Sequence, residues 1–173
     1  MSEPVSYVSE SLEPLSLISP EQTEAAGASL ARAIQAVAPD KLCICLEGEL
    51  GAGKTTFARG LLRGFGYVGR VPSPTYTLVE PYDVEPYRIY HLDLYRLHDG
   101  AELEYLGISE MTDRGSVLLV EWPSRAADSL PAKDLEVVLK VSSEGRVLAL
   151  QSYSPVGADL AAAFTRDAAV SGT

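Results

Sequence analysis

Residues 48–55 have the composition and spacing of a phosphate-binding loop. They read GELGAGKT and match the pattern G-x-x-x-x-G-K-[ST] at every fixed position. Glycines in such a loop let the backbone wrap a phosphate and turn amide hydrogens toward it, and the following helix directs its positive end at the same group. Lys54 can bridge the β- and γ-phosphates, while the Thr55 hydroxyl can ligate Mg²⁺. We therefore predict nucleotide contacts from the whole loop: Gly48, Glu49, Leu50, Gly51, Ala52, Gly53, Lys54, Thr55 and Thr56.

Two carboxylates follow other predicted strands. Glu121 comes directly after the apolar run 117–120, and Asp93 follows residues 87–92. Ligands of open α/β sheets collect at the carboxyl ends of strands, so both acids are well placed if these strands run parallel to the one before the loop. Glu121 could then ligate Mg²⁺, directly or through water, or orient the attacking water. The alternative is that both acids merely end strands and face water.

Three hydroxyl residues, Ser73, Thr75 and Thr77, lie about twenty residues after Lys54 in a stretch stiffened by Pro72 and Pro74. P-loop proteins often present a hydroxyl to the γ-phosphate and magnesium from such a segment, which then acts as a switch. The spacing alone is equally compatible with a simple turn that leads into a strand.

The elements that must position these residues can be read along the chain. Ser19, Pro20 and Gln22 are typical of a helix start, with an N-cap, a proline at the first position and a capping-box partner, and this helix should end near residue 38. Residues 42–46 predict a buried strand leading into the loop, and a helix follows over 54–65 with Gly66 as its stop. Further strands are predicted at 75–80, 87–92 and 117–120, short helices at 101–105 and 109–113, and an antiparallel hairpin from 135–141 and 146–151.

These elements predict an α/β protein with a P-loop NTPase-like three-layer fold. Its sheet should be mixed and mainly parallel, with a C-terminal antiparallel hairpin. We place one ATPase domain at residues 19–155. Residues 1–18 are interpreted as a flexible N-terminal arm or short edge strand, and residues 156–173 as a C-terminal tail or a short, frayed helix.

Composition excludes several classes of protein. The 173 residues carry 14 Lys and Arg against 24 Asp and Glu, a net charge of −10, whereas a chain that grips nucleic acid alone usually carries a basic patch. We therefore expect no DNA binding, and we expect any RNA to be held by another protein. Cys43 and Cys45 are interpreted as core side chains rather than a disulfide or zinc site. No apolar run is long enough to span a bilayer and no signal peptide is recognisable, so a cytoplasmic location is expected.

Residues that the sequence lacks exclude some classes of nucleotide-binding protein. The chain contains no asparagine, and no aspartate is followed by glycine at the third position, so the guanine-reading N-K-x-D and the D-x-x-G of GTPases are both absent. A protein-kinase catalytic loop also requires its asparagine. A small-molecule kinase remains open, although no compact arginine cluster suggests a lid. Seven of the nine tyrosines lie between Tyr67 and Tyr105, which suits either core packing or a protein-contact surface. Trp122, directly after Glu121, could pack under the site or meet a partner.

Five blocks in order resemble the TsaE family, formerly YjeE. They are residues 48–56 (GELGAGKTT), 72–82 (PSPTYTLVEPY), 91–97 (HLDLYRL), 103–108 (LEYLGI) and 120–123 (VEWP), and the resemblance spans about residues 20 to 150. The family comprises bacterial ATPases of tRNA N6-threonylcarbamoyladenosine biosynthesis. The resemblance implies that the chain associates with the TsaB–TsaD pair, and that ATP hydrolysis resets that complex between rounds of modification beside the anticodon.

The resemblance also implies roles for individual residues. Lys54 and Thr55 would bind phosphate and Mg²⁺, Asp93 and Glu121 would serve the active site, and Thr75 would belong to a switch segment, while Thr23 in the first helix would touch the nucleotide. Hydrolysis should be slow until the partner completes the site, because no arginine finger is evident. Two other hypotheses remain: a small-molecule P-loop phosphotransferase, and a binding module in which ATP acts only as a switch.

Overall fold

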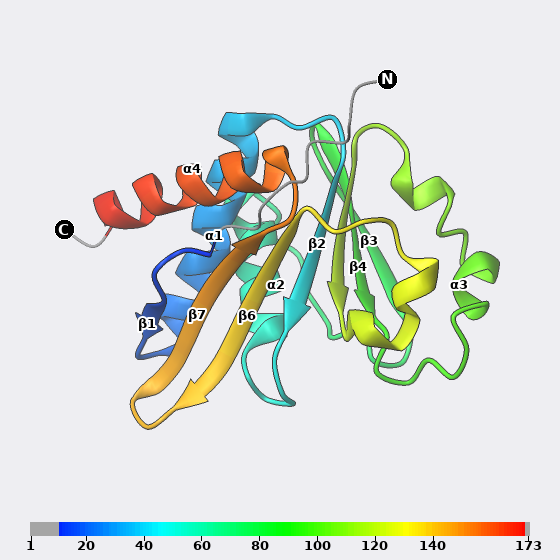
Figure 1. Ribbon diagram of the computed structural model, residues 1–173, viewed down its shortest axis with the longest axis horizontal. Coiled ribbons are helices and arrows are strands. Elements are labelled where there is room, and N and C mark those ends of the chain that lie inside the picture. Colours follow the sequence, from blue (N-terminus) through cyan, green and yellow to red (C-terminus); the bar gives the residue numbers. More distant parts are fainter. Residues whose placement is uncertain (1–10, 172–173) are drawn as a thin grey trace, which may run out of the picture.

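A seven-stranded mixed sheet runs through the centre of the computed structural model, which describes residues 11–171 (Figure 1). The strand order is β1-β7-β6-β2-β5-β4-β3. The four central strands run parallel to one another: β6 (Leu135–Ser142), β2 (Leu42–Glu47), β5 (Ser116–Glu121) and β4 (Tyr87–Asp93). The flanking strands pair antiparallel: β1 (Leu15–Leu17), β7 (Gly145–Ser152) and β3 (Val79–Val84). The predicted α/β fold, with its parallel sheet core and C-terminal hairpin, is confirmed.

The register of the parallel strands aligns their carboxyl ends. Leu46 of β2 lies opposite Glu121 of β5, and Glu121 lies opposite Asp93 of β4. The loop that follows β2 therefore starts at the same edge of the sheet at which these two acids end their strands. This is the edge at which ligands bind in open α/β sheets.

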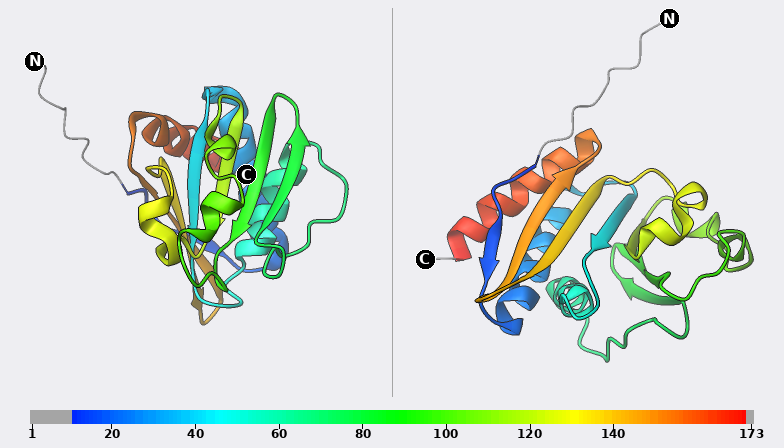
Figure 2. Two further views of the ribbon diagram at one scale, coloured as in Figure 1. Left: turned by 90° about the vertical axis from the view of Figure 1, so that its right-hand side faces the viewer. Right: turned by 60° about the horizontal axis from the view of Figure 1, so that its bottom comes forward.

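Three helices cover one face of the sheet: α1 (Pro20–Val37), α2 (Lys54–Gly64) and α4 (Pro155–Ser171) (Figure 2). Helices α1 and α2 cross at two glycines. A Cβ atom on Gly27 would lie 2.1 Å from the Phe57 carbonyl oxygen, and one on Gly60 would lie 1.9 Å from that of Glu24. Because only glycine permits this approach, the crossing holds the start of α1 beside the start of α2.

The opposite face is covered by shorter elements: α3 (Glu102–Tyr105) and the 3-10 helices η1 (Glu110–Thr112) and η2 (Pro123–Ser129). They enclose a second apolar cluster, which includes Leu92, Leu118 and Val120. Cys43 and Cys45 are free and buried in the same cluster, as predicted. The three predicted layers are therefore present, but the second helical layer consists of fragments.

The start of α1 follows the prediction closely. The Ser19 side chain accepts a hydrogen bond from the Gln22 amide at 3.2 Å, and the Gln22 side chain accepts one from the Ile18 amide at 2.9 Å. Both bonds satisfy donors that would otherwise lack partners at the helix start. The helix ends at Val37, and Ala38 takes a left-handed φ of 52°.

The strand predicted at residues 75–80 is wrong in its position. Residues 74–77 form a turn, and β3 begins only at Val79. Within this turn the Leu78 amide bonds to the Pro74 carbonyl at 2.8 Å, and Leu78 itself has a φ of 68°. β-propensity favoured a strand here, but the backbone is turned by this local hydrogen bond instead.

At both chain ends the described residues contain an element that the prediction offered as one of its alternatives. Of the predicted arm, residues 1–10 lie outside the described residues, while Leu15–Leu17 forms the edge strand β1 paired with β7. The predicted short C-terminal helix is the 17-residue α4, which buries Leu160, Ala161 and Phe164 in the main core. Residues 172 and 173 lie outside the described residues.

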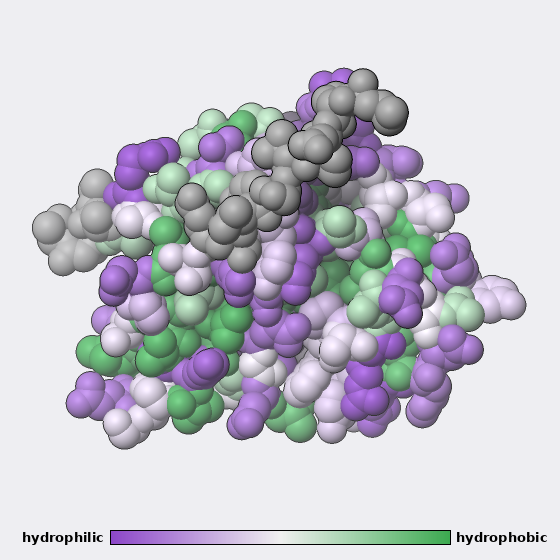
Figure 3. All heavy atoms as spheres, in the orientation of Figure 1, coloured by the Kyte–Doolittle hydropathy of each residue, from purple (hydrophilic) through white to green (hydrophobic). Residues whose placement is uncertain are grey.

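The surface over this fold is mixed in character. Hydrophilic and hydrophobic residues are interspersed across the face drawn in Figure 3. Within residues 11–171, no helix combines the length and apolarity needed to cross a membrane.

Candidate active site

The phosphate loop connects β2 to α2 at the carboxyl edge of the sheet. Gly51 and Gly53 take left-handed φ angles of 77° and 104°, which strain any residue with a side chain. Gly53 occupies the N-cap position of α2 and provides no side-chain cap. The first amides of α2 therefore remain available to an anion, which is the arrangement expected of a phosphate-binding loop.

Lys54 is buried beneath this loop. Its Nζ donates to the Gly48 carbonyl oxygen and lies 3.8 Å from the centre of the Trp122 ring. Burial lowers the pKa of Lys54, while the nearby carboxylates of Glu121, Asp93 and Glu47 oppose that shift. The lysine is thus held among acceptors that a bound phosphate could replace.

The two predicted acids are both buried beside the loop. Asp93 accepts a hydrogen bond from the Thr75 hydroxyl at 3.1 Å and another from the Tyr95 amide at 3.0 Å. Glu121 pairs through Oε2 with Nε2 of His91 at 2.6 Å. Neither acid merely faces water at a strand end. Each is fixed by specific partners.

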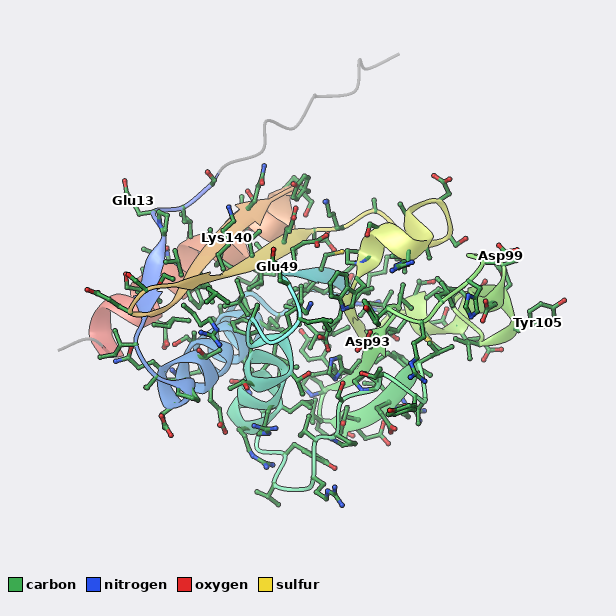
Figure 4. The ribbon with its side chains drawn as sticks, turned by 90° about the horizontal axis from the view of Figure 1, so that it is seen from below. Glu13, Glu49, Asp93, Asp99, Tyr105 and Lys140 are labelled. Carbon is green, nitrogen blue, oxygen red and sulfur yellow. The ribbon has the colours of Figure 1, made fainter. Side chains whose placement is uncertain are left out.

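One cavity of about 310 Å³ brings most of the predicted site residues together. Figure 4 shows this edge of the sheet, with Glu49 of the loop and Asp93 near its middle and Tyr105 far to one side. The residues that line the cavity are Leu50, Gly51, Gly53, Lys54, Thr55, Thr56, Ser73, Thr75, Asp93, Glu121 and Trp122. The predicted loop residues Gly48, Glu49 and Ala52 belong to the same loop but do not line this cavity.

The hydroxyl segment contains a connected chain of hydrogen bonds. The Thr75 hydroxyl donates to Asp93, so the contact of 2.8 Å between the Ser73 and Thr75 hydroxyls is donated by Ser73. Thr77 instead bonds the half-buried Glu80 at 3.0 Å and does not line the cavity. Of the two alternatives left by the spacing, the geometry favours a segment that presents hydroxyls to the site.

A second cavity of about 220 Å³ adjoins the first and shares Gly51, Gly53 and Thr56 with it. Thr23, which the resemblance implied would touch the nucleotide, lines this cavity from the start of α1. Arg146 of β7 lines it too, and its guanidinium donates to the carbonyl oxygens of Gly51 at 2.9 Å and Ala52 at 3.0 Å. The hairpin thereby fastens the phosphate loop from the side opposite the acids.

The cavity also has the oxygen donors that Mg²⁺ prefers. Thr55 contributes a hydroxyl, and Asp93 and Glu121 contribute carboxylates. Within residues 11–171, no cluster of three or more His, Cys, Asp or Glu side chains is arranged to hold a metal ion. An ion here would therefore take further ligands from phosphate oxygens and water, which is the usual coordination of Mg²⁺. The residues present fit such an ion.

Sequence reasoning assigned no role to His91 or Arg146, which the structure brings to the site, and it left the role of Trp122 open. His91 precedes Asp93 by two positions, so strand alternation could have placed it on the same face as the acids. Trp122 lies over Lys54 and packs against Tyr95 with ring centres 5.0 Å apart. Arg146 is 92 positions beyond Lys54 and gave no local signal. The tyrosines divide, since Tyr82 and Tyr87 are buried whereas Tyr76 and Tyr105 are exposed.

Comparisons with known proteins identify related sequences. Residues 17–148 match the family model described as threonylcarbamoyl adenosine biosynthesis protein TsaE. The chain is 42% identical over 124 residues to the tRNA threonylcarbamoyladenosine biosynthesis protein TsaE of Haemophilus influenzae, covering 72% of this chain and 78% of the relative. It is 39% identical to the protein of the same name from Bacillus subtilis over 123 residues, covering 71% and 74%.

A solved structure supports the same assignment. The crystal structure of Bacillus subtilis YdiB superposes with a TM-score of 0.76 at 30% identity, covering 93% of this chain and 98% of that one. The described fold is therefore shared over nearly the full length of both chains.

Proposed function

The chain belongs to the TsaE family of threonylcarbamoyladenosine biosynthesis proteins, and from this premise we propose that it is an ATP hydrolase serving the N6-threonylcarbamoyladenosine modification of tRNA. Its relatives are named for this pathway. The hydrolase acts with the TsaB–TsaD pair, and ATP turnover resets that complex between rounds. Such a role places the protein with tRNA in the cytoplasm.

The observation that carries the proposal is the single cavity lined by Lys54, Thr55, Asp93 and Glu121. The loop amides and the start of α2 would bind the β- and γ-phosphates, and Lys54 would exchange its bond to Gly48 for phosphate oxygens. Glu121 and Asp93 are then the carboxylates nearest the reacting end of the nucleotide. Positioning and charge stabilisation are the main contributions of a protein to phosphoryl transfer.

The adjoining cavity supports the placement of the rest of the nucleotide. It lies on the far side of Gly51 and Gly53 from the acids and is lined by Thr23, Thr56 and Arg146. A triphosphate running across the two glycines would place its nucleoside there. Arg146 would stabilise the loop in the conformation that receives the phosphates, because it holds two loop carbonyls away from them.

Magnesium would be held by the Thr55 hydroxyl together with a carboxylate of the cavity, Glu121 or Asp93, directly or through water. When bound, the ion would neutralise charge on the phosphate oxygens during transfer. Thr75 and Ser73 would sense the γ-phosphate through the hydroxyl chain that already reaches Asp93.

The net charge of −10 supports an indirect contact with tRNA. A surface that bound tRNA alone would need many phosphate contacts from Lys and Arg. We propose that TsaB and TsaD hold the tRNA and complete the ATPase site, so that the isolated chain turns over slowly.

Steady-state release of ADP and phosphate, measured with and without TsaB–TsaD, tests the proposal. We expect slow turnover alone, faster turnover with the pair, and formation of the three-protein complex only with ATP present. Equal rates in both conditions would contradict partner dependence. Transfer of phosphate to a metabolite rather than to water would favour the small-molecule phosphotransferase instead. Partner function that survived in a Glu121→Gln variant without hydrolysis would favour a nucleotide-gated switch.

A further inference from the structure

His91 of β4 and Glu121 of β5 form a buried pair near the carboxyl ends of these two neighbouring strands. Their Nε2 and Oε2 atoms lie 2.6 Å apart, and the residues are 0% and 2% exposed. A buried polar pair of this kind contributes little net stability compared with apolar side chains of similar volume, since both groups must first lose their water. Because the contact is close and fully enclosed but contributes little stability, we looked for its role in its effect on Glu121.

The hydrogen bonding of the pair defines which atom carries the proton. His91 Nδ1 is buried and has no hydrogen-bond partner among the described residues. A buried acceptor without a partner is tolerated more readily than a buried N–H donor without one. A ring with its proton on Nε2 therefore satisfies the site best, and His91 donates to Oε2 of Glu121.

This bond determines which oxygen of Glu121 serves the cavity. Oε2 is committed to His91, so Oε1 is the oxygen left to accept a hydrogen bond from a water beside the γ-phosphate. His91 does not line the cavity itself. It lies opposite Leu119 in the pairing of β4 with β5, two positions deeper in the sheet than Glu121. Whatever His91 does to the reaction must therefore pass through Glu121.

We infer that His91 is a positioning residue for ATP hydrolysis, which holds Glu121 by its Oε2 so that Oε1 orients the attacking water. The inference rests on the proposed ATPase function and adds a second residue to its water site. Groups that fix the orientation of a reacting side chain matter because small displacements of that side chain lower the rate steeply.

The test is a set of variants of the full chain assayed for ATP turnover under the conditions in which the wild type is active. His91→Leu removes the donor, His91→Gln keeps an amide that can reach Glu121, and His91→Asn keeps an amide that is too short. Each is also made with Glu121→Gln. Trp122 is the only tryptophan and stacks over Lys54, so its fluorescence reports nucleotide binding independently of turnover.

Tyr87→Phe provides a matched control. Tyr87 lies on the same strand and face as His91, four positions earlier, and its hydroxyl donates a buried hydrogen bond to the Pro39 carbonyl at 2.9 Å. Its removal also costs one buried hydrogen bond but touches neither cavity. We expect this variant to hydrolyse ATP at the wild-type rate.

We expect His91→Leu and His91→Asn to lower kcat by roughly 10- to 100-fold, as loss of an orienting partner commonly does, with ATP affinity changed by less than about threefold. His91→Gln should keep kcat within about fivefold of the wild type. Adding His91→Leu to Glu121→Gln should slow turnover no further than Glu121→Gln alone, because residues acting as one unit are not additive.

Three results would overturn the inference. The first is a folded His91→Leu or His91→Asn variant with wild-type kcat. The second is a loss that adds in full to that of Glu121→Gln. The third is a His91→Gln variant as slow as His91→Asn, which would mean that His91 acts by packing. The comparison of these two variants remains decisive even if His91→Leu does not fold. A wild-type protein with no turnover, alone or with TsaB–TsaD, would overturn the proposed function and this inference together. Silent His91 variants of an active wild type would overturn the inference alone.

Discussion

The two faces of the parallel sheet core are built by alternate residues of the same strands, yet they differ in chemistry. On the face beneath α1 and α2, the strand ends place His91, Asp93 and Glu121 in the interior. On the opposite face, Leu92 and Val120 occupy the intervening positions and pack in an apolar cluster. Every one of these side chains is buried, so exposure does not explain the contrast.

The difference separates residues that stabilise the fold from residues that serve the site. Burying charged and polar groups costs free energy that apolar side chains do not lose, and a domain of this size has little stability to spare. Asp93, Glu121 and Lys54, which line one cavity, are therefore better explained by the proposed phosphate site than by folding. If this is correct, substitutions on the two faces should damage different properties of the protein.

The largest expected effect follows removal of the buried cation. Lys54→Ala should lower ATP turnover by about 10³-fold, or ~4 kcal/mol of transition-state stabilisation, because the β- and γ-phosphates lose their lysine contact. Phosphate release measures the rate, and thermal unfolding shows that the variant is folded. Lys41→Ala removes the same charge just before the opposite end of β2 and should leave turnover unchanged. Comparable losses in both variants would mean that the lysine at the loop has no special role.

Substitution on the apolar face should instead affect stability alone. Leu118→Ala removes a fully buried side chain of β5 and should lower the free energy of unfolding by about 2–5 kcal/mol, with turnover per folded molecule unchanged. Chemical denaturation measures the first quantity, and turnover corrected for the folded fraction measures the second.

Leu119→Ala is the matched variant on the site face. Leu119 is equally buried but lies opposite His91 in the register of β4 and β5. Its truncation should therefore cost similar stability and, by loosening the surroundings of His91, also lower turnover. Equal turnover in the two leucine variants would remove the functional distinction between the faces.

Sequence reasoning predicted the parallel core because its signals are local. Each signal occupies only a few residues: the loop pattern, the apolar strands 42–46 and 117–120, and the acids Asp93 and Glu121 that follow strands. The geometry of a parallel sheet then brings Lys54, Asp93 and Glu121 together. The strand predicted at 75–80 failed for the opposite reason. Its composition suits a strand, but the turn between Pro74 and Leu78 carries Thr75 to Asp93, which only the tertiary structure reveals.

Contacts between distant parts of the chain could not be predicted in the same way. Arg146 reaches the loop only because β7 runs beside β6, which in turn pairs with β2. The burial of α4 likewise depends on packing against α1, and an alanine-rich segment alone does not indicate a partner. The position of His91 could have been predicted from the sequence, since its alternation with Asp93 places both side chains on one face of the sheet.

A smaller effect is expected from the hydroxyl segment, where the chain offers a matched pair. Thr75→Val removes the hydroxyl bound to Asp93 and should lower turnover by about tenfold, the equivalent of one hydrogen bond of ~1.4 kcal/mol. Thr77→Val makes the same change at a residue that bonds Glu80 outside the cavity, and it should leave the rate unchanged. Thr75→Ser, which keeps a hydroxyl, should recover most of the activity. Identical rates for the two valine variants would assign Thr75 to the turn alone.

The smallest expected effect is on stability and concerns a charged pair between α1 and α4, outside the cavity. The Arg32 guanidinium of α1 bonds both carboxylate oxygens of Asp167 in α4, each at 2.8 Å, and this hydrogen bonding holds the pKa of Asp167 below its ordinary value. A carboxyl with a depressed pKa stabilises the folded state above its unfolded pKa of about 3.9 and loses that contribution as pH falls through the folded pKa. Because both side chains are partly exposed, Asp167→Asn should cost at most about 1 kcal/mol at neutral pH, and nothing once the medium is more acidic than the folded pKa.

Urea denaturation of wild type and Asp167→Asn from neutral to acidic pH measures this difference, and ATP turnover should be equal in both. Asp40→Asn breaks the more exposed pair with Arg114 and should show a still smaller change. A difference that persisted unchanged into acid would show that Asp167 acts by packing rather than charge. A loss of turnover in Asp167→Asn would mean that a charge outside the cavity, on the face covered by α1, α2 and α4, also affects catalysis. The contrast between the two faces would then not depend on the strand-end residues of the cavity.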